Sequence, residues 1–220
     1  MSSQAKKVFF ANYTFYVEPD VYEPAEDSFL FAENLTVEHG EHVLDMGTGC
    51  GILGVIAAEN ASSVVAVDIN PNAVRCAKEN ARLNGVINKM SFVRGDLFAP
   101  FKVGEHFDLI LFNAPYLPSE PWEGTMWIER AWAGGADGRA VLDRFLQTFP
   151  WYLKADGRVL LMQSTLADLE KTFQVLEAQG FKAEVIAERS FPLFETAVLI
   201  EARRRTLQNP RSAQFFLDVI

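Results

Sequence analysis

Short apolar runs alternate with segments of helical spacing through most of the chain, and this alternation constrains the fold more than any other feature. Residues 42–46 (HVLDM) predict a buried strand, residues 47–51 (GTGCG) a tight turn, and residues 52–60 (ILGVIAAEN) a helix. Strands that alternate with helices are typical of a parallel sheet, because a parallel strand is reached only through a crossover connection. The alternation therefore predicts an α/β fold.

The pattern changes in the carboxyl-terminal part of the chain. Residues 181–203 contain two strand-like runs joined by a short connection with Pro192, which predicts an antiparallel hairpin. Pro71 and Gly85 stand where helices usually begin and end. The other predicted strands span residues 63–70, 89–98, 107–116 and 157–164, and the other predicted helices span residues 71–85, 138–154 and 166–180.

The composition predicts one soluble domain and argues against several classes of function. A chain of 220 residues with 49% hydrophobic content can bury one sizeable core. It has no apolar run of about 18 residues and its amino terminus is polar, so we expect a cytoplasmic protein with no membrane segment. The net charge of −9 argues against a broad nucleic-acid surface. Cys50 and Cys76 form no disulfide or zinc pattern, and we assign no metal.

The turn after the first predicted strand has the glycine content of a ligand-binding loop. Asp68 ends the next predicted strand, where a carboxylate can accept hydrogen bonds from ribose hydroxyls. The glycine spacing does not match the GxGxxG pattern of dinucleotide sites, and Asp45 suits a cationic ligand better than a pyrophosphate. The loop resembles the first motif of class I S-adenosylmethionine-dependent methyltransferases, which implies that cofactor and the binding residues Asp45, Gly47, Thr48, Gly49, Gly51 and Asp68.

The predicted strand at residues 107–116 ends in Asn-Ala-Pro-Tyr, a rigid polar corner at the edge of the sheet where ligands bind. This corner resembles the Asn-Pro-Pro-Tyr motif of amino-group methyltransferases. With residues 21–35 (VYEPAEDSFLFAENL) and 128–146 (IERAWAGGADGRAVLDRFL), it resembles the HemK family of glutamine N5-methyltransferases, especially its short eukaryotic and archaeal branch.

The resemblance implies a Rossmann-like, seven-stranded class I methyltransferase fold, with a mostly parallel sheet and a C-terminal antiparallel hairpin. It covers residues 21–203, which we expect to be the catalytic domain. Residues 1–20 are then an N-terminal extension, and residues 204–220 are a C-terminal tail.

The chemistry of an amide explains why the corner carries an asparagine instead of an acid or a base. An amide nitrogen is a poor nucleophile because its lone pair is delocalised, so acceptors that hold both N–H groups help it become tetrahedral. The Asn113 side-chain oxygen and the Ala114 carbonyl can be these acceptors. Tyr116 is expected to lie against the amide, and Pro115 is expected to hold the corner.

The same resemblance implies further contacts and partners. By position, Ser28 corresponds to a residue near the methionine carboxylate of the cofactor, and Asp96 and Leu97 correspond to residues near its adenine. The implied substrate is the glutamine of the Gly-Gly-Gln loop in a class 1 peptide-release factor. The implied partner is a small Trm112-like zinc-binding activator on an apolar sheet edge, and we expect residues 89–98 to form an outermost strand.

One departure from the family and several alternatives affect this interpretation. The family has proline where this sequence has Ala114, so Ala114→Pro is expected to be tolerated if the Ala114 N–H is unpaired and its φ suits proline. The methyl acceptor could instead be adenine N6 in a nucleic acid, a protein lysine or a small-molecule amine. A noncatalytic, methyltransferase-like binding subunit is the remaining alternative.

Overall fold

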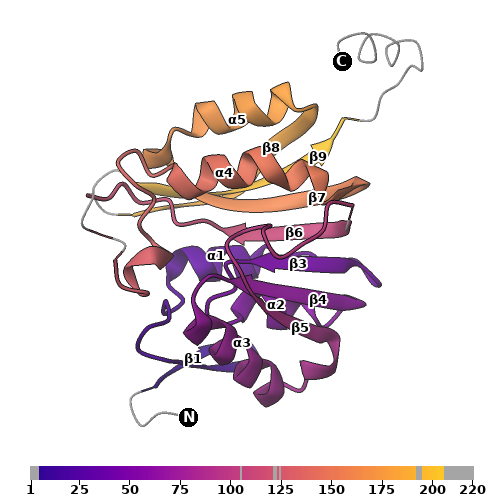
Figure 1. Ribbon diagram of the computed structural model, residues 1–220, viewed down its shortest axis with the longest axis vertical. Helices are drawn as coiled ribbons and strands as arrows, with labels where there is room; N and C mark the ends of the chain where they lie inside the picture. The colour runs from indigo at the N-terminus through magenta and orange to yellow at the C-terminus, as the bar shows by residue number, and fades with distance from the viewer. Residues whose placement is uncertain (1–4, 105, 121–122, 124, 192–194, 206–220) are drawn as a thin grey trace.

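The computed structural model describes residues 5–104, 106–120, 123, 125–191 and 195–205, which form a seven-stranded sheet with helices on both faces and a separate two-stranded hairpin (Figure 1). The five strands β3 to β7 run parallel to one another, whereas β9 runs antiparallel to both β7 and β8. The strand order is β5-β4-β3-β6-β7-β9-β8. The strands are β3 (His42–Met46), β4 (Ser63–Asp68), β5 (Met90–Arg94), β6 (Phe107–Asn113), β7 (Leu153–Ser164), β8 (Phe181–Ser190) and β9 (Thr196–Arg204).

This architecture confirms the predicted class I methyltransferase fold and the C-terminal antiparallel hairpin. Strand β5 lies at one edge of the sheet, as the sequence predicts. Pro192, in the predicted connection of the hairpin, lies outside the described residues.

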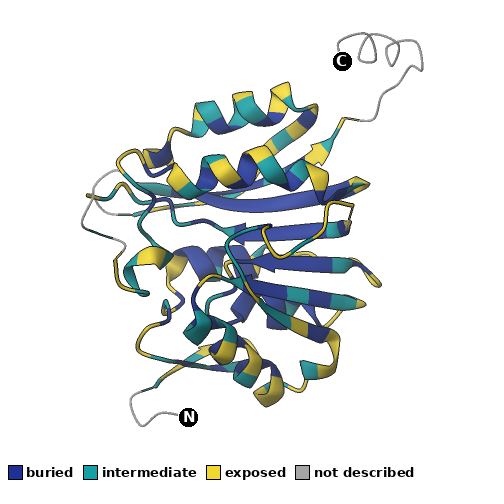
Figure 2. Ribbon diagram, viewed as in Figure 1, coloured by how far each residue is buried: buried dark blue, intermediate teal, exposed yellow. Residues whose placement is uncertain are grey.

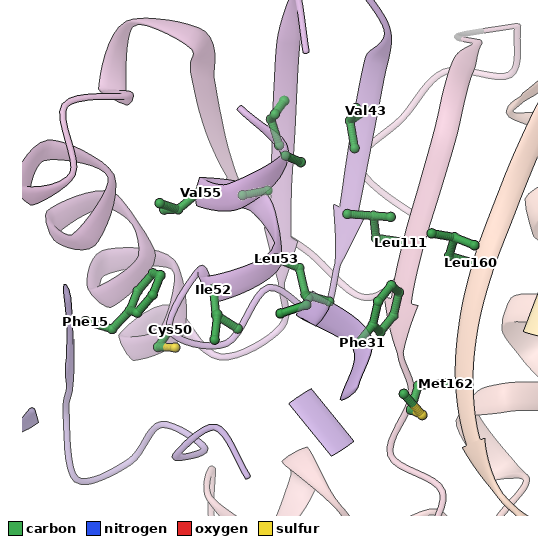
Figure 3. Close-up of a cluster of buried hydrophobic side chains, with 14 of the residues drawn as sticks. Phe15, Phe31, Val43, Cys50, Ile52, Leu53, Val55, Leu111, Leu160 and Met162 are labelled. Atoms are coloured by element: carbon green, nitrogen blue, oxygen red, sulfur yellow. The ribbon is translucent and has the colours of Figure 1, made fainter. Parts of the chain in front are cut away.

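Successive residues of the central strands pack into two different cores, one on each face of the sheet. Along β6, for example, Leu109 and Leu111 face one core while Ile110 and Phe112 face the other (Figure 3 shows the first core). Burial on both faces explains why these strands read as continuous apolar runs and appear dark blue in Figure 2. The helices are α1 (Glu26–Glu33), α2 (Ile52–Ala57) and α3 (Pro71–Leu83) at the first core, and α4 (Ala140–Thr148) and α5 (Leu169–Ala178) at the second.

The predicted helix at residues 138–154 is wrong in its second half. Helix α4 ends at Thr148, because Pro150 has no N–H to donate and its ring obstructs a continuing helix. A 3-10 turn follows, and Leu153 already belongs to β7, where it pairs with Phe107.

The predicted helix at residues 166–180 is likewise shorter: a 3-10 turn covers Thr165–Ala167 before α5 begins. The 3-10 turns are η1 (Ile87–Lys89), η2 (Glu129–Ala131), η3 (Phe149–Trp151) and η4 (Thr165–Ala167).

An N-terminal hairpin of β1 (Lys6–Phe10) and β2 (Tyr13–Val17) lies outside the main sheet. Its second strand buries Phe15 and Val17 in the first core, against residues of the α2 and α3 region. Figure 3 shows Phe15 beside Cys50 and Ile52. Both cysteines, Cys50 and Cys76, are buried there as free thiols. Among the described residues, no helix is long and apolar enough to cross a membrane.

The strand register places the predicted site residues at one level of the sheet. Met46 of β3 pairs with Val67 of β4 and with Phe112 of β6. The next residues along these three parallel strands, Gly47, Asp68 and Asn113, therefore meet at the carboxyl edge, where α/β proteins bind ligands.

Candidate functional site

A cavity of about 510 Å³ opens at this carboxyl edge, and most of the predicted site residues line it. Two tryptophans, Trp127 and Trp132, also line it. Gly51 is the predicted cofactor residue that does not line the cavity. The predicted residues in the cavity wall are Ser28, Asp45, Gly47, Thr48, Gly49, Asp68, Asp96, Leu97, Asn113, Ala114, Pro115 and Tyr116.

The glycine-rich turn between β3 and α2 uses a left-handed backbone that other residues rarely adopt. Gly47 has φ 68°, Gly49 has φ 56° and Gly51 has φ 88°. At Gly51 a Cβ atom would also lie 3.0 Å from Ala77 of α3, so this glycine lets the turn approach the helix. Gly51 thus lets the turn pack against α3, whereas Gly47 and Gly49 line the cavity.

Asp45 at the end of β3 is almost fully buried and holds the turn in place. Its Oδ2 accepts hydrogen bonds from the Thr48 hydroxyl at 2.6 Å and from the Gly54 N–H at 3.0 Å. Burial raises the pKa of Asp45 to about 6, although both hydrogen bonds oppose this rise. The carboxylate therefore links the strand, the turn and α2 at the cavity wall.

Asp68 at the end of β4 presents a second carboxylate to the cavity. Its Oδ2 accepts the Gly49 N–H at 2.9 Å, and its Oδ1 accepts the Asn70 N–H at 2.8 Å. Burial raises the pKa of this carboxyl above its usual value, and the backbone N–H groups oppose the shift. These two bonds fix the carboxylate beside the glycine turn, and each oxygen keeps further acceptor capacity for a ligand hydroxyl.

Asn113 at the end of β6 has one end of its side-chain amide fixed and the other end free. Its Nδ2 donates to Asp27 Oδ2 at 3.0 Å and to Ser28 Oγ at 3.4 Å. Its Oδ1 is buried and has no hydrogen-bond partner among the described residues. Because the Asp27 carboxylate can only accept, it dictates which way the amide faces. The unpaired Oδ1 is thus available to a donor from a ligand.

Asp27, which sequence reasoning did not select, is the centre of this arrangement. Besides Asn113, its carboxylate accepts the Tyr116 hydroxyl at 3.1 Å, the Tyr22 hydroxyl at 3.4 Å and the Ser28 N–H at 2.7 Å. Burial, together with the nearby Asp27 charge, raises the pKa of both tyrosines, so their hydroxyls stay protonated donors. The adjacent acid in the motif EPAEDS, next to Ser28, was the signal available in the sequence.

Ala114 follows Asn113 and is buried, and its N–H donates to the Met162 carbonyl at 3.4 Å. The expectation that Ala114→Pro is tolerated required an unpaired N–H, and this condition is not met. Proline would remove this long hydrogen bond from the junction with β7. Ala114 therefore keeps a link to the neighbouring strand that the family proline cannot make.

Asp96 and Leu97 lie on the far wall of the cavity, after β5. Asp96 is partly exposed and forms an ion pair with Arg144 of α4 at 2.7 Å. Leu97 has a positive φ of 47°, which is unusual for a residue with a side chain. The ion pair thus links the loop at this wall to α4.

A second segment, Trp132–Arg139, supports the corner formed by residues 113–116. The Leu117 N–H donates to the Trp132 carbonyl at 3.0 Å, and the Gly134 N–H donates to the Leu117 carbonyl at 2.8 Å. Gly138 packs so closely that a Cβ atom there would lie 2.3 Å from the Tyr116 carbonyl oxygen.

Arg139 is fully buried and donates to Asp143 Oδ1, the Asp168 carbonyl and the Thr172 hydroxyl. We call the segment Trp132–Arg139 the glycine clamp.

Glu129, which lies between Trp127 and Trp132 in the sequence, does not line the cavity. Its Oε2 accepts the backbone N–H groups of Thr125 and Met126, both at 3.0 Å, and so stabilises the loop. Among the described residues, no three His, Cys, Asp or Glu side chains gather as a metal site.

Comparisons with known proteins agree with this geometry. Residues 12–127 match the family model of the methyltransferase small domain. A candidate protein N5-glutamine methyltransferase of Methanocaldococcus jannaschii is 45% identical over 190 residues, which cover 86% of this chain and 94% of that protein. The methyltransferase HEMK2 of Homo sapiens is 34% identical over 181 residues, covering 77% of this chain and 84% of that protein.

A solved structure shares the fold at lower identity. The E. cuniculi Mtq2–Trm112 complex, responsible for methylation of the translation termination factor eRF1, matches with a TM-score of 0.65 and 24% identity. The match covers 84% of this chain and 99% of that chain. The family model and the two relatives together show that the chain belongs to the HemK-like glutamine N5-methyltransferases, which are class I, S-adenosylmethionine-dependent methyltransferases.

Proposed function

We propose that this protein methylates the side-chain amide of a glutamine, in the Gly-Gly-Gln loop of a class 1 peptide-release factor. The observation that carries the proposal is the buried, unpaired Oδ1 of Asn113, beside a side-chain nitrogen held by Asp27. An acceptor that is desolvated before the substrate arrives is a strong partner for an incoming N–H donor. A glutamine amide offers such a donor together with the nitrogen to be methylated.

The residues of the cavity fit S-adenosylmethionine. The left-handed turn at Gly47 and Gly49 leaves open space where side chains would otherwise stand, and Asp68 is fixed to accept the hydroxyls of a ribose. Ser28 and the loop with Asp96 and Leu97 line other parts of the wall, and we propose them as contacts of the methionine carboxylate and of the adenine, respectively. When bound, S-adenosylmethionine supplies an electrophilic methyl group on its sulfonium.

The corner at residues 113–116 then orients the nucleophile. Asn113 Oδ1 accepts one N–H of the glutamine amide, and the Ala114 carbonyl accepts the other. These two bonds weaken the conjugation of the nitrogen with its carbonyl and direct its lone pair toward the methyl group. Tyr116, held by its hydroxyl bond to Asp27, lies against the amide plane. After transfer the nitrogen is acidic and loses its proton to water, so the corner needs no titrating base.

The release-factor substrate is the finer part of the proposal. It is supported by the E. cuniculi complex, which methylates a termination factor, and by the similarity to the M. jannaschii candidate glutamine methyltransferase. A lysine acceptor is the main rival, because the Asp27 carboxylate could also attract an amine. A lysine amine can also donate to Asn113 Oδ1, so glutamine is favoured by the pair of acceptors, Asn113 Oδ1 and the Ala114 carbonyl, which match the two N–H groups of a planar amide.

The direct test is to incubate the protein with labelled S-adenosylmethionine and a class 1 release factor, and to locate the methyl group by mass spectrometry. We expect label on the glutamine of the Gly-Gly-Gln loop. A release factor in which that glutamine is replaced by lysine is the matched acceptor, and we expect it to stay unlabelled. Label on the lysine variant, or none on the native factor, contradicts the proposal.

Asp68→Ala should weaken S-adenosylmethionine binding about tenfold or more. The variant removes a half-buried carboxylate whose charge-assisted hydrogen bonds are worth roughly 1.5 to 3 kcal/mol. Calorimetric titration of the cofactor measures the change directly. Asp156→Ala, an exposed aspartate of β7 outside the cavity wall, is the control and should bind with wild-type affinity. Unchanged affinity in Asp68→Ala would show that this acid does not contact the cofactor.

A small Trm112-like zinc-binding activator is the proposed partner, and the open edge of β5 is its proposed binding site. Co-expression with such a protein should raise the soluble yield or the methyl-transfer rate of this chain. Size-exclusion chromatography of the co-expressed pair should give one peak at the mass of a 1:1 complex. If the chain alone is monodisperse and equally active, the activator is dispensable.

A further inference from the structure

The backbone of β2 forms hydrogen bonds with two different partners, strand β1 and the side chains of two asparagines. One edge pairs with β1 as an ordinary antiparallel ladder. Two asparagines of the α3 region, one helical turn apart, bind the backbone of β2 in the same way. Asn84 Oδ1 accepts the Thr14 N–H at 3.1 Å while its Nδ2 donates to the Thr14 carbonyl at 2.9 Å. Asn80 does the same with Tyr16, at 2.9 Å for both bonds.

Asn80, unlike Asn84, also contacts the cofactor site. Its Nδ2 also donates to the Cys50 carbonyl, in the glycine turn of the cofactor site, at 2.8 Å. Asn80 is fully buried, so these hydrogen bonds are made in a site from which water is excluded. A single side chain thus joins the hairpin, α3 and the turn that lines the cavity.

Another asparagine, Asn70, makes a similar link at the start of α3. Asn70 caps α3 by accepting the Asn72 N–H, and its own N–H donates to Asp68 Oδ1. Its Nδ2 donates to the Asp20 carbonyl at 2.7 Å, just beyond the hairpin. The segment from Thr14 to Asp20 is therefore tied to the glycine turn through Asn80 and to the strand-end acid through Asn70.

We propose that Asn80 is a positioning residue for cofactor binding, and that it makes the N-terminal hairpin part of the S-adenosylmethionine site. Its bond to Cys50 holds the carboxyl-terminal half of the glycine turn, whereas Thr48 and Gly49 are held by β4 through Val67 and Asp68. The hairpin completes the hydrogen bonds that hold the Asn80 amide in position. The inference concerns cofactor affinity and does not depend on which acceptor is methylated.

The test compares Asn80→Ala with Asn84→Ala by calorimetric titration of S-adenosylmethionine. Both variants remove a paired contact with β2 and place the same residue in the same helix region, so both should lower the melting temperature. Only Asn80→Ala removes the bond to the turn, and we expect its Kd to rise about tenfold, as for one lost hydrogen bond. Asn84→Ala should stay within about twofold of wild type.

A second measurement uses the unaltered chain and so does not depend on the folding of a variant. If the cofactor and the hairpin are coupled, the cofactor must stabilise the hairpin by the same amount that the hairpin strengthens cofactor binding. Short-time hydrogen exchange should therefore slow at Tyr13–Val17 when S-adenosylmethionine is added. Strand β8 at the far edge of the sheet is the internal control and should exchange at an unchanged rate.

Two outcomes would overturn the inference. Equal cofactor affinity in Asn80→Ala and Asn84→Ala would show that Asn80 serves stability alone. Cofactor protection of the glycine turn without protection of Tyr13–Val17 would show that the hairpin is not coupled to the site. Neither outcome bears on the glutamine substrate, which is judged by where the methyl group is found.

Discussion

Asn113→Ala should lower methyl transfer on the order of a hundredfold or more and leave the affinity for S-adenosylmethionine nearly unchanged. Removal of one positioned polar group from a desolvated site commonly has an effect of this size. The cofactor affinity should hold because the proposed partner of Asn113 Oδ1 is the acceptor amide. Single-turnover transfer at saturating cofactor separates this chemical step from binding.

Asn34→Ala provides the control for Asn113→Ala. Asn34 follows α1, its Nδ2 donates to the nearby Leu30 carbonyl at 2.9 Å, and it is not among the described residues that line the cavity. This variant should transfer methyl groups at the wild-type rate. Near-normal turnover in Asn113→Ala would remove the amide-orientation mechanism, and with it the main reason for preferring glutamine over an amine.

Gly138→Ala should be the most damaging single change in the glycine clamp, because it combines two effects. Gly138 has φ 72°, which costs a residue with a Cβ about 1 to 2 kcal/mol. The new Cβ would also lie 2.3 Å from the Tyr116 carbonyl oxygen, so the corner must move. Displacement of a positioning group by about 1 Å can cost a hundredfold in rate, and we expect methyl transfer to fall on that order.

Gly180→Ala separates the two effects. Gly180 has φ 81°, but a Cβ there would meet nothing within 4 Å. This variant should therefore lose stability without losing the rate of methyl transfer, as measured by thermal unfolding and single-turnover assays. Gly138→Asn is a further comparison, because asparagine tolerates a positive φ but still carries a Cβ. If Gly138→Asn restores the rate, backbone strain alone explains the defect, and contact with Tyr116 does not.

The sequence predicted the parts of the molecule in which local pattern and tertiary structure agree. The central strands are apolar on both faces and read as continuous runs, and Pro71 marks the start of α3 correctly. The helix over residues 138–154 was predicted too long because apolar spacing continues past Thr148, where Pro150 ends the helix. The N-terminal hairpin was not predicted at all, since it depends on side-chain amides 64 to 70 residues away.

In the candidate site, too, some residues could be identified from local sequence pattern and others depend on contacts with distant segments. Its residues at strand ends could be selected from their places after apolar runs, and the register brings them together. Asp27 could not be selected in this way, because its importance lies in contacts 86 and 89 residues away in sequence, with Asn113 and Tyr116. The paired state of the Ala114 N–H was likewise invisible in the sequence, since it depends on how closely β7 approaches the corner.

The last strand of the described residues, β9, is an interior strand of the sheet, between β7 and β8. During synthesis, β8 therefore emerges before the strand that attaches it to the sheet, and β7 keeps an open edge until β9 arrives. A chain that stops before Thr196 would leave β8 without its partner and expose the pairing edge of β7 from Arg158 to Ser164. A premature stop before β9 would thus remove an interior strand of the sheet, and the exposed edge of β7 would favour aggregation.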